Sequence, residues 1–191
     1  MFPLAEEDRH TLLAIARGAL EAAIDPRAPR FELPSVAGRL AEPAGAFVTL
    51  RQRGRLRGCV GQMESPEILA IVVAHCSVAA AVEDRRFTPV IAEEFPDLSI
   101  EISVLSRLLP VSAEEVIPGT HGLLITRGNC RGVLLPQVAR ELEWSRERFL
   151  EETCLKAGLA RDAWTDPATR IEVFTAESFA ERERPSRRRA S

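Results

Sequence analysis

The sequence predicts an α+β protein made of two related β-hairpin and helix halves, which form an antiparallel, partly closed, barrel-like sheet with helices outside. The prediction rests on an order of elements that occurs twice. A strand, a turn, a second strand and a helix are expected over residues 46–82, and the same order recurs over residues 122–156. Both hairpins turn on an Arg-Gly pair, and both second strands carry another. Strands joined by short turns pair antiparallel, whereas a parallel sheet needs long crossovers.

Length and charge set the class of protein. The chain has 191 residues, which fits one domain, and we expect residues 1–180 to form a single domain of two lobes. Residues 181–191 are polar and charged, so we expect a disordered tail there. The net charge of −3 and the pI of about 5.8 argue against a nucleic-acid-binding protein.

The start of the chain and its apolar runs predict the compartment. Acidic residues precede any apolar run, which argues against a secretory signal. No apolar stretch reaches the roughly 18 residues of a membrane span. We therefore expect a cytoplasmic protein that does not bind membranes and keeps its thiols reduced.

The first half of the chain opens with an amphipathic helix over residues 4–24, because its apolar residues recur at helical spacing. Prolines then make residues 25–45 a connecting segment. A hairpin of alternating strands follows, with its turn at Gly54, and an alanine-rich apolar helix comes after Pro66. The elements expected after the first helix are a strand over 46–50, a strand over 56–60, a helix over 67–82, a charged loop over 84–89 and a strand over 98–108.

The second half repeats this order. Residues 113–117 form at most a short helical turn, and a second hairpin turns at Gly128. A helix over residues 144–156 ends before Gly158, which suits the position after a helix C-terminus. The elements expected around it are strands over 123–126, 132–135 and 171–174.

Cys59 is the first candidate for chemistry. It lies between Gly58 and Gly61, and glycines allow a ligand to approach the backbone closely. Arg55 and Arg57 precede it and could favour the nucleophilic thiolate. The alternative is that Cys59 is a small buried hydrophobic residue, which is the usual place of a free cysteine.

Four further residues outside the Arg-Gly-Cys motif belong to the predicted site. His121 stands in a glycine-rich turn before a strand, where it either acts in catalysis or caps the turn. Asp84 and Arg86 lie in the charged loop, where Asp84 could orient a partner and Arg86 could bind an anion. The alternative for these two is a solvated loop. Gln137 follows a strand and is either a site residue or the start of a helix.

No metal site is predicted from the sequence. The four cysteines form no Cys-x-x-Cys pair and show no zinc-like spacing with the three histidines. We therefore assign no metal ligands, and the identity of any cofactor stays unknown.

Several segments together resemble the AMMECR family, over roughly residues 5–180. The most specific is the Leu-Arg-Gly-Cys-Val-Gly sequence at residues 56–61. The others, in order, are residues 47–50, Asp84 with Arg86-Phe87 and Pro89, 102–106, 121–123, 134–139, Phe149-Leu150, and Cys154 with 156–159. Bacterial and archaeal members resemble protein A of the AmmeMemoRadiSam system, which groups this domain with a Memo-like protein and a radical SAM protein. The resemblance implies an α+β fold of two β-rich halves around a cleft.

The resemblance implies a site at the Arg-Gly-Cys motif and no settled reaction. We expect an enzyme or enzyme subunit that acts on a small anionic molecule in a cleft. Cys59 and His121 would be catalytic, and Arg57, Gly58, Gly61, Asp84, Arg86 and Gln137 would bind substrate. The alternative is a non-catalytic partner or scaffold of the Memo-like or radical SAM protein. A nucleic-acid-binding module is a third reading, which the acidic pI disfavours.

Overall fold

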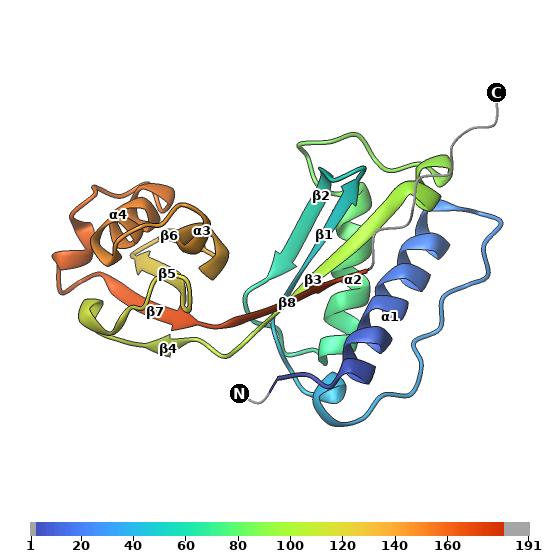
Figure 1. Ribbon diagram of the computed structural model, residues 1–191, viewed down its shortest axis with the longest axis horizontal. Helices are drawn as coiled ribbons and strands as arrows, with labels where there is room; N and C mark the ends of the chain where they lie inside the picture. The colour runs from blue at the N-terminus through green and yellow to red at the C-terminus, as the bar shows by residue number, and fades with distance from the viewer. Residues whose placement is uncertain (1–2, 182–191) are drawn as a thin grey trace. The chain divides into compact units, whose positions relative to one another are not determined.

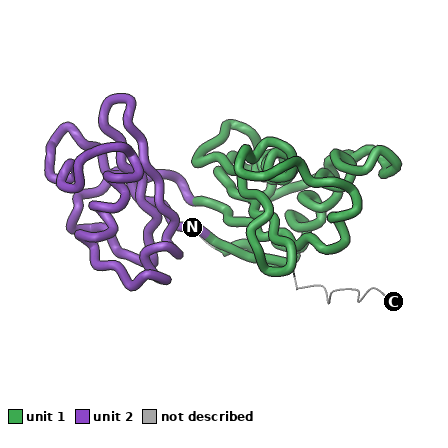
Figure 2. The backbone as a smooth tube through the Cα atoms, turned by 90° about the horizontal axis from the view of Figure 1, so that it is seen from above, with its two compact units in different colours: residues 1–105, 177–191 green, residues 106–176 purple. Residues whose placement is uncertain are grey.

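The computed structural model describes residues 3–181, which fold as two compact units (Figure 2). The first unit contains the chain up to Leu105 and again from Glu177, and the second unit contains Ser106–Ala176. Each unit has a hydrophobic core of its own. Of the disordered tail predicted over residues 181–191, residues 182–191 lie outside the described residues. Glu181 is ordered, because its backbone N–H donates to the carbonyl oxygen of Ile100 at 3.0 Å and its carboxylate binds Arg17.

The first unit is a four-stranded antiparallel sheet with helices on one face (Figure 1). The strand order is β2-β1-β3-β8, so β2 and β8 are the edges. The strands are β1 (Ala46–Gln52), β2 (Arg55–Gln62), β3 (Leu98–Leu105) and β8 (Ala176–Ala180), and the helices are α1 (Glu6–Ile24) and α2 (Leu69–Val82).

Alternation along the strands decides which face of this sheet is covered. In β1, Ala46, Val48 and Leu50 are fully buried, and α2 packs against β1 and β2 while α1 packs against α2 and β3. Thr49, between these residues, points to the opposite face and is only partly buried. Among the described residues of this unit, no helix packs against the opposite face, which we call the open face.

The second unit repeats this design at smaller scale. Its antiparallel sheet has the order β4-β7-β5-β6, and the helix α4 packs against β5 and β6. The core includes Leu123, Ile125 and the fully buried Phe149. The elements are β4 (Leu109–Pro110), β5 (Gly122–Arg127), β6 (Cys130–Leu134), α3 (Pro136–Glu141), α4 (Arg146–Lys156) and β7 (Arg170–Phe174).

The two units share one strand order. The first hairpin and the strand after its helix are ordered β2-β1-β3, and the second hairpin and its following strand are ordered β6-β5-β7. The fourth strand of each sheet comes from the segment that follows the other repeat: β4 follows β3, and β8 follows β7. This order supports the two related halves expected from the sequence.

The α+β class and the antiparallel sheets are confirmed, with three corrections. Both sheets are open, with two edge strands each, and not partly closed as expected. The strand expected over 98–108 ends at Leu105, because the chain there leaves the first sheet and adds β4 to the second. The strand β8 and the short helix α3 were not predicted; β8 alternates too weakly in hydropathy to be recognised as a strand.

Four short 3₁₀ segments connect the helices and strands of the described residues. The 3₁₀ segments are Gly38–Ala41, Ala92–Asp97, Ala113–Glu115 and Ala163–Thr165. Among the described residues, none of the helices has the length and apolar character needed to cross a bilayer.

Candidate functional site

A β-bulge at Arg57 decides where the side chain of Cys59 points. The hairpin turns on Arg53 and Gly54, which both have positive φ, as a two-residue type I′ turn requires. From this turn the two strands pair in regular register up to Arg51, which lies opposite Leu56. The register then shifts by one residue, so that Leu50 lies opposite Gly58. Arg57 is the extra residue. A one-residue slip moves the following side chains to the other face of the sheet. The bulge therefore turns Gly58 toward the helices and Cys59 toward the open face.

Gly58 is a packing residue against α2. A Cβ atom at this position would lie 2.0 Å from the carbonyl oxygen of Ala80, which is a backbone atom. Gly132 in the second hairpin has the same role, because a Cβ there would lie 2.5 Å from the carbonyl oxygen of Thr153 in α4. The residue that follows is Cys59 in the first unit and Val133 in the second. The glycine of the motif thus serves the fold in both units, and the thiol is particular to the first.

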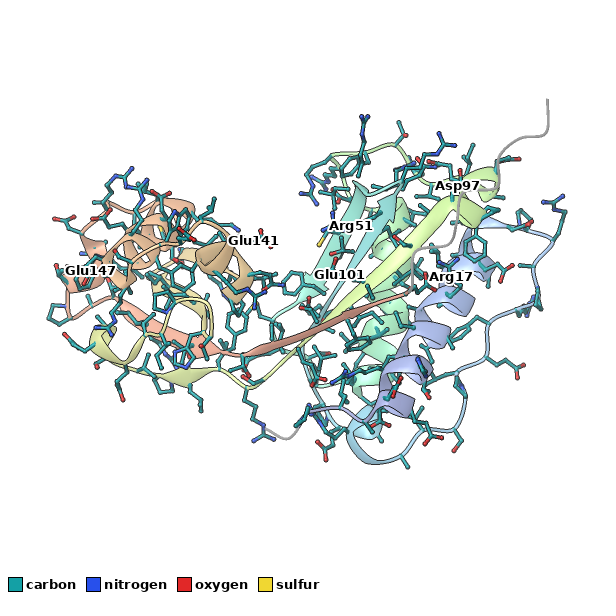
Figure 3. All side chains as sticks on the ribbon, in the orientation of Figure 1. Arg17, Arg51, Asp97, Glu101, Glu141 and Glu147 are labelled. Carbon is teal, nitrogen blue, oxygen red and sulfur yellow. The ribbon has the colours of Figure 1, made fainter. Side chains whose placement is uncertain are left out.

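The open face places a thiol beside polar side chains. Cys59 pairs with Thr49 across the sheet, and Thr49 pairs with Glu101 on the next strand. The hydroxyl of Thr49 donates to the sulfur of Cys59 at 3.3 Å. Arg51 and Glu101 form an ion pair of 3.3 Å on this face (Figure 3). Gly61 lies under the ring of Phe47, so its missing side chain makes room for an aromatic residue of the protein itself.

Asp84 and Arg86 close the edge of the sheet at Cys59. The Asp84 carboxylate accepts the backbone N–H of Cys59 at 2.9 Å, and Arg86 Nη2 donates to the backbone carbonyl of Cys59 at 3.4 Å. Arg86 also donates to Asp84 from Nε and Nη2, at 2.9 and 2.7 Å. β2 is an edge strand, and an open edge leaves backbone groups unpaired. The two side chains therefore take the place of a neighbouring strand and fix the backbone of Cys59.

Asp84 and Arg86 together form a clamp on the backbone of Cys59, and they carry opposite charges held close together. The Asp84 side chain is only 7% exposed, and its pKa is lowered, first by hydrogen bonds from the Arg86 guanidinium and then by the backbone N–H groups of Cys59 and Arg86. The pKa of Arg86 is raised, first by those hydrogen bonds to Asp84 and then by the negative charges of Asp84 and of the Cys59 thiolate. Arg86 is 59% exposed and packs over the Phe87 ring. A cation thus contacts the backbone of Cys59 and is in reach of solvent.

Arg57 lies in the same strand and is engaged elsewhere. Its guanidinium donates to both carboxylate oxygens of Glu94, at 2.8 and 2.9 Å, and to the carbonyl oxygen of Thr88 at 2.8 Å. The side chain is 13% exposed. The pKa of Glu94 is lowered, first by the hydrogen bonds from Arg57. In this arrangement Arg57 anchors the loop after α2, and its predicted role in binding substrate stays a prediction.

The other cysteines lie in different surroundings. Cys76 and Cys154 are buried in the cores of the first and second units, and burial raises the pKa of both thiols, that of Cys76 to about 11. Cys130 is partly exposed at the turn of the second hairpin. Cys59 and Cys130 are therefore the two thiols within reach of solvent, and Cys59 is the one that has a hydroxyl donor.

His121 and Gln137 belong to the second unit. His121 Nδ1 accepts the backbone N–H of Ile117 at 3.2 Å, which closes the turn before β5. With Nδ1 occupied as an acceptor, the hydrogen of the neutral ring is on Nε2, which can donate a hydrogen bond. Gln137 is the second residue of α3. The structure thus brings Cys59, Asp84 and Arg86 together in the first unit, and convergence with His121 and Gln137 stays a prediction.

Two contributors to the site were missed from the sequence. Thr49 lies one strand away from Cys59, and the register that makes them partners depends on the bulge. Glu94 comes from a 3₁₀ turn after the charged loop. Composition gave no signal for either residue; a hairpin register drawn with the bulge in place would have found Thr49.

Among the described residues, Cys59 belongs to no group of metal ligands, and it lines neither of two hollows of the first unit. No group of three or more His, Cys, Asp or Glu residues able to hold a metal ion occurs within residues 3–181. Two hollows of about 360 and 330 Å³ flank the ring of Phe31, between α1, α2 and the connecting segment. Neither is lined by a residue of the predicted site.

Comparisons with known proteins agree in family and in fold. The AMMECR1 family model matches residues 13–179. A protein of Methanothermobacter thermautotrophicus is 40% identical over 190 residues, which cover 94% of this chain and 97% of the relative. A protein of Aquifex aeolicus is 42% identical over 147 residues, 73% of this chain and 75% of the relative. The crystal structure of an uncharacterized protein from Pyrococcus horikoshii has a TM-score of 0.83 at 36% identity and covers 95% of each chain.

Proposed function

Because the chain belongs to the AMMECR1 family, we propose that it is an enzyme or an enzyme subunit that acts on a small anionic molecule through the thiol of Cys59. The observation that carries the proposal is the surroundings of that thiol. Cys59 is partly exposed on the open face of the sheet, receives a hydrogen bond from Thr49, and has its backbone fixed by Asp84 and Arg86.

The chemistry follows from the thiol and the cation beside it. A thiolate is a strong nucleophile, and a fixed backbone holds it in one position. Arg86 is planar, permanently charged and largely exposed, so it suits a carboxylate or phosphate group. An anionic substrate would therefore be drawn to the side of the sheet on which the nucleophile lies.

A pair of alkylating reagents tests this proposal without knowledge of the substrate. Iodoacetate is anionic and iodoacetamide is neutral, so the ratio of their rates reports the local potential at each thiol. We expect Arg86→Gln to lower this ratio at Cys59 by roughly fivefold at low salt, because it removes a unit charge close to the sulfur. High salt should reduce the difference. Peptide mass spectrometry of labelled Cys59 gives both rates.

Two controls belong to this experiment. Arg27→Gln removes an arginine that binds Asp25 in the same Asp-x-Arg arrangement, far from any cysteine in sequence, and should leave the ratio unchanged. Cys130 in the same sample is an internal reference, since it is also partly exposed. If Cys59 and Cys130 show equal ratios, and Arg86→Gln has no effect, the anionic substrate is ruled out. If Cys76 labels faster than Cys59 in the folded protein, Cys59 is structural.

We also propose that the protein acts with a Memo-like protein and a radical SAM protein. The support is its family membership, together with the resemblance to protein A of the AmmeMemoRadiSam system. Size-exclusion chromatography of the purified proteins, alone and mixed, should show co-elution with at least one of the two. Cys59→Ser should leave co-elution unchanged if the thiol serves chemistry. Loss of co-elution in Cys59→Ser, with no reactive thiol in the unmodified protein, would instead favour a scaffold whose motif is an interaction surface.

A further inference from the structure

The contact between Thr49 and Cys59 is fixed by the pairing of the two strands. The backbone N–H of Cys59 donates to Asp84, and its backbone carbonyl oxygen accepts a hydrogen bond from Arg86. Both backbone groups therefore point away from β1. Thr49 and Cys59 therefore form a non-hydrogen-bonded pair of the antiparallel ladder, the kind in which facing side chains lie closest. Their 3.3 Å contact follows from this register.

The direction of this hydrogen bond has a chemical consequence. The hydroxyl of Thr49 donates and the sulfur accepts. A donor to sulfur stabilises the thiolate more than the thiol, because the charged acceptor binds the hydrogen more strongly. Threonine is branched at Cβ, so few rotamers are open to it and the hydroxyl stays aimed at its partner.

We propose that Thr49 is a positioning residue for the reaction at Cys59, where its hydroxyl favours the thiolate and orients the sulfur on the open face of the sheet. This inference rests on the proposed function, because it assigns a role in the same reaction. It adds a residue that is outside the Arg-Gly-Cys motif and that reaches the site only through the bulge at Arg57.

Thr49→Val provides the test, since valine keeps the shape of threonine and removes the hydroxyl. Loss of the bond should lower the thiolate fraction of Cys59 roughly tenfold at a pH at which the thiol is mostly protonated, because the thiolate loses its donor. A more basic thiolate is intrinsically more nucleophilic, by roughly threefold per pKa unit. With a neutral reagent such as dithiodipyridine, Thr49→Val should react roughly threefold slower at about pH 7 and roughly threefold faster at a pH high enough to ionise the thiol fully in both proteins.

Thr49→Val is expected to react more slowly than the original protein at about pH 7 and faster at high pH. This reversal separates a positioning role from a structural one. A change of packing or exposure would shift both rates in the same direction. Thr49→Ser keeps the hydroxyl and should restore the pH profile. Thr126→Val, a partly buried strand threonine of the second unit, should leave Cys59 unchanged.

The outcomes distinguish the two proposals. An unchanged profile in Thr49→Val, with a reactive and anion-selective Cys59, overturns the role of Thr49 and leaves the proposed function standing. A Cys59 that labels no faster than Cys76 in the folded protein, whatever stands at position 49, overturns both. A profile that shifts in Thr49→Val and returns in Thr49→Ser supports the inference.

Discussion

Replacing Gly58 by alanine is expected to lower the free energy of unfolding by about 3 kcal/mol or more, a large part of the roughly 5–15 kcal/mol of a typical domain. The added Cβ would lie 2.0 Å from the carbonyl oxygen of Ala80, and both the strand and α2 are held by their own backbone hydrogen bonds. Neither β2 nor α2 can shift to relieve this overlap without weakening its own hydrogen bonds. Urea unfolding followed by circular dichroism measures the loss, and low expression or partial folding would be its extreme form.

Two further variants show that the effect comes from close packing. Gly132→Ala should also be strongly destabilising, because its Cβ would lie 2.5 Å from backbone atoms of Thr153 and Ala157. Gly54→Asn should cost little, since nothing lies within 4 Å of that position and asparagine tolerates positive φ. Equal stability of Gly58→Ala and Gly54→Asn would contradict the packing role of Gly58.

Replacing Asp84 by asparagine is expected to cost about 2–3 kcal/mol at neutral pH. The change removes the charge from hydrogen bonds to Arg86 and to the backbone of Cys59, and it puts an amide N–H₂ against a guanidinium donor. The cost should depend on pH. Because the pKa of Asp84 is lowered in the folded protein, its contribution is complete above the unfolded pKa of about 4 and is lost as the pH falls below it.

The measurement is chemical unfolding of both proteins at a series of pH values. The difference between the original protein and Asp84→Asn should be constant above about pH 5 and shrink below about pH 4. Asp25→Asn is the matched control, because Asp25 binds Arg27 by the same pattern on an exposed loop, with no strand edge to close. It should change stability little. A pH-independent difference for Asp84→Asn would mean that its charge does not hold the edge of β2.

The sequence determined the elements because their signals are local. Alternating apolar and polar residues predicted the strands of the two hairpins. The helical spacing of apolar residues predicted α1, α2 and α4 close to their observed bounds. The repeated hairpin and helix order predicted two related halves, which the shared strand order supports. Open rather than closed sheets could not be predicted, because β4 and β8 are short and weakly patterned and join their sheets through long-range pairing.

The candidate site was predicted in part. The thiol, the clamp residues Asp84 and Arg86, and the glycines were all named from their place in turns, loops and the motif. The structure adds contacts that the sequence did not predict: Arg57 binds Glu94, and Gly58 packs against the backbone of α2. The roles of both residues in binding substrate stay predictions.

The bulge explains why these contacts needed the tertiary structure. A regular hairpin from the turn at Arg53 and Gly54 would pair Thr49 with Gly58 and turn Cys59 toward the helices, into the core. The extra residue, Arg57, reverses this. Its place is set by long-range contacts: the guanidinium reaches Glu94, 37 residues away in sequence, and only glycine fits against Ala80. The sequence by itself determined that a cysteine lies in this strand; only packing against α2 and the following loop decided that its thiol faces outward, because register in a hairpin is resolved by what each face must contact.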